Sequence, residues 1–158
     1  MLVSIRFVPV MIVCTAVAIA SSAQARPSKQ DAELLASKAL GWALDGGLAG
    51  AKALPATAAI DVVAVTLPAG AELKVPGRTV SVSSLIRLQA EADVKADRPV
   101  FVFNSVVVRG ERATVSLSLK WAVAVRSTAT PPAVQGAVLE FERRGESWEI
   151  AKVSERWP

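Results

Sequence analysis

An alternation of apolar residues with small or polar residues runs from Thr114 to Val125, in the segment TVSLSLKWAVAV. Six consecutive pairs fit a period of two. This predicts a long β-strand, because successive side chains of a strand point to opposite faces of the sheet. One face, which includes Trp121, is expected to lie in the core. The other face includes Lys120 and is expected to meet solvent or a cavity.

Three more segments in the C-terminal half have the patterns of strands. Residues 100–108 are apolar and rich in β-branched side chains, and residues 137–142 and 147–153 alternate. Tight connections at 109–112 and 144–146 favour antiparallel neighbours. We therefore expect four antiparallel strands in a meander.

The N-terminal half has the signals of a helix. Ser28 and Asp31, three residues later, suit a helix start, because the serine caps the first turn and the carboxylate favours the helix dipole. Apolar residues then recur at steps of three and four as far as Gly46 and Gly47. These glycines suit the left-handed turn that ends many helices.

The middle of the chain alternates between strand and helix signals. Residues 60–66 are rich in β-branched side chains and predict a strand, and residues 79–82 predict a brief extended piece. Residues 85–95 predict a second helix, capped by one of the serines before it. The fold class is therefore α+β, with N-terminal helices on a curved antiparallel sheet that ends in the meander. The long loop 67–78 is either functional or mobile.

The first 25 residues have the layout of a secretory signal peptide. Arg6 precedes an apolar run over residues 7–20, and small residues ending in an A-x-A pattern follow as far as Ala25. We expect residues 1–25 to be removed and residues 26–158 to form a single α+β domain. This domain is expected to be periplasmic or secreted, with no stable membrane span, because the apolar run is short for a bilayer. Removal of residues 1–25 takes away Cys14, which is the sole cysteine of the chain.

The residue types that the chain lacks restrict its chemistry. It has no histidine and no tyrosine, and it has no cysteine once residues 1–25 are removed, so the usual near-neutral acid–base groups and nitrogen or sulfur metal sites are not expected. No metal and no cofactor is predicted. The formal net charge is +4, but the basic residues are scattered without interleaved aromatic residues, so nucleic acid is not an expected partner.

The element order and the closing segment suggest a family. Residues 138–153 read VLEFERRGESWEIAKV, in which an apolar strand and a charged turn with Gly145 precede a return strand with Trp148 and Ile150. This resembles the last hairpin of the NTF2-like (cystatin-like α+β) superfamily. The resemblance implies a curved sheet that wraps helices into a cone. It implies no site residue, because enzymes of this superfamily often place His, Asp or Tyr in the cone, and this chain has no His or Tyr.

Four side chains are candidate site residues. Asp61 lies within an apolar strand. It is either a buried carboxylate that acts as a base or a group on the solvated face of the strand, and the second alternative is favoured because buried unpaired carboxylates are rare. Lys120 and Arg126 either receive an anionic ligand or serve solubility. Trp157 is a candidate exposed aromatic contact, whereas Trp121 and Trp148 are expected in the core.

Three functions are compatible with these patterns. The first is an exported, non-catalytic protein that binds a small ligand or a partner protein at the bacterial envelope. The second is a cone-cavity enzyme of isomerase or lyase type with Asp61 as its base. The third is a small inhibitor or immunity-type factor. If Trp121 is a core residue, Trp121→Ala should cost about 3–5 kcal/mol of stability.

Overall fold

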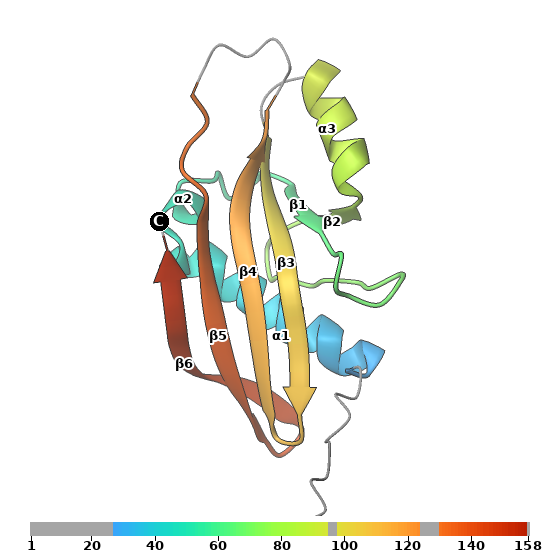
Figure 1. Ribbon diagram of the computed structural model, residues 1–158, viewed down its shortest axis with the longest axis vertical. Helices are drawn as coiled ribbons and strands as arrows, with labels where there is room; N and C mark the ends of the chain where they lie inside the picture. The colour runs from blue at the N-terminus through green and yellow to red at the C-terminus, as the bar shows by residue number, and fades with distance from the viewer. Residues whose placement is uncertain (1–26, 95–97, 124–129, 158) are drawn as a thin grey trace, which may run out of the picture.

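The computed structural model describes residues 27–94, 98–123 and 130–157. The predicted signal peptide lies outside these residues. They form the α+β fold that the sequence predicts, with helices packed on one sheet (Figure 1). The helical elements are α1 (Lys29–Trp42), a π-helical turn (Ala43–Gly47), α2 (Ala49–Lys52) and α3 (Leu85–Val94). The strands are β1 (Ile60–Val63), β2 (Val80–Ser83), β3 (Arg98–Arg109), β4 (Arg112–Ala122), β5 (Gln135–Arg144) and β6 (Ser147–Trp157).

The described strands form one six-stranded sheet in the order β2-β1-β3-β4-β5-β6. Strands β3 to β6 pair antiparallel in chain order. Strand β1 instead pairs parallel with both β2 and β3, so the expectation of a wholly antiparallel sheet is wrong. Parallel neighbours need long crossover connections, and the loop 64–79 and helix α3 supply them. The sheet has edges at β2 and β6 and is not closed.

Helix α1 crosses one face of the sheet and covers the main core (Figure 1). Its apolar side contributes Leu35, Ala39 and Leu40, which are fully buried. The strands contribute Phe103 and Leu117 from the same cluster. This face therefore holds the main core of the domain, and the opposite face of the long strands is left for helix α3 and solvent.

Both ends of helix α1 follow the sequence signals. The backbone N–H of Asp31 donates to the Ser28 hydroxyl oxygen at 3.1 Å, and that hydroxyl donates to the Asp31 carboxylate at 2.9 Å. After Trp42 the helix continues as the π-helical turn Ala43–Gly47, in which Gly46 has a φ of 105°, within the left-handed region that glycine tolerates. The predicted start and end of the helix are confirmed.

Asp31 also joins the first turn of α1 to the β5–β6 hairpin. Trp148 Nε1 donates to Asp31 Oδ1 at 2.9 Å, and the Arg143 guanidinium pairs with the same oxygen. The guanidinium carbon of Arg143 lies 4.6 Å from the centre of the Trp148 ring. Burial raises the pKa of Asp31, but hydrogen bonds from Trp148 and Ser28 and the charge of Arg143 outweigh it, so the pKa falls below its ordinary 3.8.

This cluster predicts an acid-dependent loss of stability. The unfolded chain binds a proton at Asp31 more readily than the folded chain, so the contribution of Asp31 is present above the ordinary pKa of 3.8 and is lost as pH falls through the lower folded pKa. We expect Asp31→Asn to cost about 1–3 kcal/mol at neutral pH, and this difference should shrink on acidification. Urea denaturation across pH measures it. The exposed Asp45 supplies the control Asp45→Asn, and an equal pH effect in both variants would contradict the assignment.

The long loop 67–78 is tied to helix α1. Leu67, Ala71 and Leu73 are buried against the core. The Glu33 carboxylate accepts the backbone N–H of Glu72 at 2.8 Å, and the Ser37 hydroxyl accepts that of Lys74 at 3.0 Å. The loop therefore covers part of the core.

The aromatic residues of the last strands differ from the sequence expectation at two positions. Trp148 is fully buried, as predicted. Trp121 is only half-buried, so its assignment to the core is wrong, and we now expect Trp121→Ala to cost less than the 3–5 kcal/mol range given above. Ile150 is 37% exposed, although it lies two residues from the buried Trp148 on the same strand, and a register shift in the β5–β6 pairing follows directly after it.

Candidate ligand groove

Helix α3 leaves an open apolar groove between itself and the face of the sheet opposite α1. The groove has a volume of about 650 Å³. Its helix wall is formed by Leu85, Ile86, Gln89 and Ala90. Its sheet floor is formed by Val100 and Val102 of β3, with Lys120, Trp121 and Ala122 of β4. This volume falls in the range of small-molecule sites, which are about 300–1,000 Å³.

The strand register explains why Val100, Val102 and Lys120 lie together on the floor of the groove. Val100 pairs with Lys120 across β3 and β4, and Val102 pairs with Ser118. Cross-strand partners share a face of the sheet, so the two valines and Lys120 all lie on the open face. Leu88 of α3 is 1% exposed and packs against Val100. Helix α3 therefore stands over one side of this face and leaves the groove beside it.

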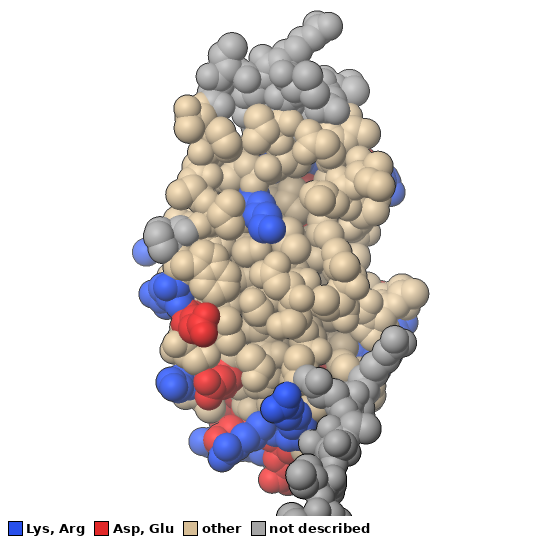
Figure 2. Space-filling view, in the orientation of Figure 1, with Lys and Arg blue, Asp and Glu red and all other residues tan. Residues whose placement is uncertain are grey.

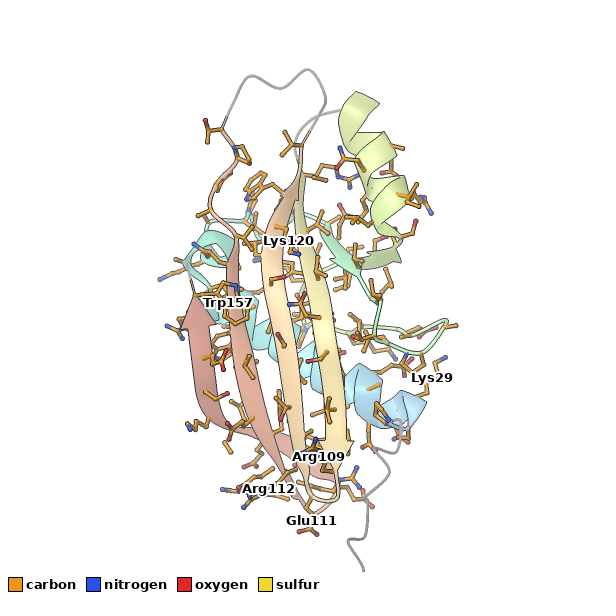
Figure 3. The ribbon with its side chains drawn as sticks, in the orientation of Figure 1. Lys29, Arg109, Glu111, Arg112, Lys120 and Trp157 are labelled. Atoms are coloured by element: carbon orange, nitrogen blue, oxygen red, sulfur yellow. The ribbon has the colours of Figure 1, made fainter. Side chains whose placement is uncertain are left out.

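Lys120 is the cation of this groove. Its side chain is exposed on the open face of the sheet, where the surrounding surface carries few charges (Figures 2 and 3). In the part of the chain that the structure describes, no ion pair includes Lys120. An ammonium group beside the valine side chains of β3 can receive an anion from a mostly apolar ligand.

An ion-pair network fixes helix α3 to the sheet. The Arg98 guanidinium, at the start of β3, pairs with two carboxylates. Its Nη2 lies 2.5 Å from Asp61 Oδ2, and its Nη1 lies 2.5 Å from Glu91 Oε2 of α3. Arg87 pairs with Glu91 one helical turn earlier, at 3.1 Å. In addition, the Gln89 side chain donates to the carbonyl of Val123 at 2.6 Å. These contacts hold the helix wall of the groove in place.

Asp61 is buried, with 6% of its surface exposed, so the solvated alternative for this residue is wrong. The Asp61 carboxylate is paired with Arg98 at 2.5 Å. It pairs in register with Val100, close to the groove, but it does not line the groove. Its geometry fits a partner that holds Arg98 in place, and gives no specific support to a carboxylate base.

The other candidates are not brought together with Asp61. Arg126 lies outside the described residues. Trp157 lies on the open face, as does Lys120, and Figure 3 shows it over β5. Its ring covers Gly136, because a Cβ atom on that glycine would meet the ring at 2.2 Å. Trp157 is therefore half-buried, and the expectation of an exposed aromatic contact needs this correction.

Sequence reasoning did not identify most of the groove. Val100 and Val102 have the pattern of core residues, and Trp121 belongs to the same alternation as core residues of β4. The available signal was the adjacent pair Leu85 and Ile86 at the start of the second helix, since adjacent residues cannot both face one sheet. Among the described residues, no cluster of Asp, Glu, His or Cys could hold a metal ion.

Comparison with known proteins adds no assignment. No family model, no curated protein and no solved structure matches this chain. The groove must therefore be interpreted from its own residues.

Proposed function

We propose that this chain is an exported, non-catalytic binding protein whose α3 groove takes an amphiphile with an apolar chain and an anionic head group. The observation that carries the proposal is the placement of the Lys120 ammonium beside an apolar groove of about 650 Å³. The apolar chain would lie between α3 and β3, and the anionic head would meet Lys120.

The energetics favour this class of ligand over a fully polar one. Burying apolar surface contributes about 25 cal/mol per Å², and the lining of the groove is mainly Leu, Ile, Val, Ala and Trp. A hydrogen bond to a charged group contributes about 1.5–3 kcal/mol when its partner is well placed. An apolar chain alone would leave Lys120 unused, and a small polar anion would leave the apolar wall unused.

The proposed envelope location rests on the signal-peptide pattern of residues 1–25. A distant relation to the NTF2-like superfamily is part of the same proposal, and its support is the element order and the closing hairpin around Gly145. In the enzyme alternative Asp61 would have to act as a base, but it is paired with Arg98. We therefore favour binding over catalysis.

Laurate and its neutral analogue dodecanol test the proposal. We expect laurate to bind with a change in the fluorescence of Trp121, which lines the groove, and with heat detectable by calorimetry. Lys120→Met should weaken laurate binding about tenfold or more and leave dodecanol binding nearly unchanged. Lys152→Met, which changes an exposed lysine of β6, is the matched control.

A second variant separates the source of the fluorescence change from the affinity of the groove for laurate. Trp121→Phe should remove most of the fluorescence change while the calorimetric affinity for laurate changes little. If laurate does not bind, or if Lys120→Met and Lys152→Met weaken it equally, the groove is not the anionic amphiphile site.

A further inference from the structure

Three large aliphatic side chains are exposed together where strand β2 meets helix α3. Val82 is 39% exposed, Leu85 is 55% exposed and Ile86 is 84% exposed. They lie within five consecutive residues of the chain, and β2 is an edge strand of the sheet. Figure 1 shows β2 and the first turn of α3 side by side at the border of the molecule. We name these three residues the β2–α3 corner.

The charged residues that lead up to the β2–α3 corner along the chain are basic, and the first acidic residue after it is Glu91, which pairs with Arg87. The segment from Leu73 to Ala90 contains Lys74, Arg78 and Arg87, and it contains no acidic residue. The side chain of Arg87 is 71% exposed, next to Ile86. An exposed apolar cluster in a basic segment is complementary to a surface that is both apolar and anionic.

The corner is continuous with the groove. Leu85 and Ile86 belong to the corner and also line the groove. A surface that covered the corner would therefore reach the mouth of the groove. A bilayer with anionic head groups combines the two properties that the corner requires, since it offers apolar chains beneath a layer of negative charge.

We propose that the β2–α3 corner docks onto an anionic lipid bilayer, with Ile86 and Leu85 inserted at the head-group boundary and Arg87 against the lipid phosphates. The interaction is peripheral: no helix of the described residues is both long and apolar enough to span a membrane. Docking goes beyond the proposed function and does not require a ligand. The passage of an amphiphile between bilayer and groove is a consequence that rests on the proposed function.

Vesicle sedimentation without laurate tests the docking. The protein is mixed with vesicles of phosphatidylcholine that contain phosphatidylglycerol, and with vesicles of phosphatidylcholine alone. We expect binding to the anionic vesicles, reduced by high salt because exposed charges are screened. Ile86→Ser should weaken this binding about tenfold, and Arg87→Gln should reduce both the binding and its dependence on salt.

Ile150→Ser is the matched control. Ile150 is 37% exposed and lies on β6, which forms the opposite edge of the sheet. This variant should bind anionic vesicles like the parent protein. Absence of vesicle binding, or an equal loss in Ile86→Ser and Ile150→Ser, would overturn the proposal. Laurate binding is measured separately in solution, so a failure of docking and a failure of the groove give different results.

Discussion

Trp148→Ala is expected to lower the free energy of unfolding by about 3–5 kcal/mol, the usual cost of removing a large buried aromatic side chain. Trp148 is fully buried in the main core. Its removal would leave a cavity beneath the β5–β6 hairpin. It would also take away the indole N–H that donates to Asp31 at 2.9 Å, so the link between this hairpin and helix α1 would weaken.

Two comparison variants separate these contributions in chemical denaturation. Trp148→Phe keeps most of the apolar volume but cannot donate to Asp31, and it should cost less than Trp148→Ala. Trp121→Ala should also cost less, because Trp121 is half-buried and lines the groove. If Trp121→Ala proves at least as costly as Trp148→Ala, our distinction between a core tryptophan and a groove tryptophan is wrong.

The features that the sequence predicts correctly depend on neighbours along the chain. Ser28 caps α1, and the backbone N–H of Arg87 donates to the Ser84 hydroxyl at the start of α3, at 3.2 Å. Gly46 adopts the left-handed conformation near the predicted end of the first helix. In each case a side chain or a glycine acts within a few residues of its own position.

The features that were missed depend on segments far apart in the chain. The parallel pairing of β1 with β3 brings Asp61 next to Val100, and no local pattern specifies that register. The burial of Asp61 depends on Arg98, 37 residues further along the chain. Trp121 continues the alternation of β4, but a period of two shows only which face a residue shares and not whether another element covers it.

The same limit applies to the candidate site. The sequence predicts Lys120 as a candidate because the alternation places it on the polar face of the long strand, where a curved sheet could turn it toward a pocket. The apolar floor was not identified, since Val102 in a groove and a valine in a core have the same pattern in the sequence. Only the position of α3 over the sheet distinguishes them.

The variant Arg98→Met tests the ion pairs that join helix α3 to the sheet. The variant should lose about 3–5 kcal/mol of stability, because removing one partner of a buried ion pair leaves the other charge without compensation. The Asp61 side chain is 8% exposed and the Arg98 side chain is 25% exposed, so little solvent is available to replace the guanidinium. The loss is measured by urea denaturation at neutral pH.

Replacing both partners should recover most of this loss. In the double variant Asp61→Leu with Arg98→Met no charge is left buried, and apolar replacements of buried ion pairs are often neutral or stabilising. Arg87→Met is the matched control, since this arginine also pairs with Glu91 but is 71% exposed, and it should cost less than about 1 kcal/mol. The double variant lacks the link from Arg98 to Glu91 on α3, so it should bind laurate more weakly even though it is stable. Recovery of stability together with unchanged laurate binding would show that the network does not position the helix wall of the groove.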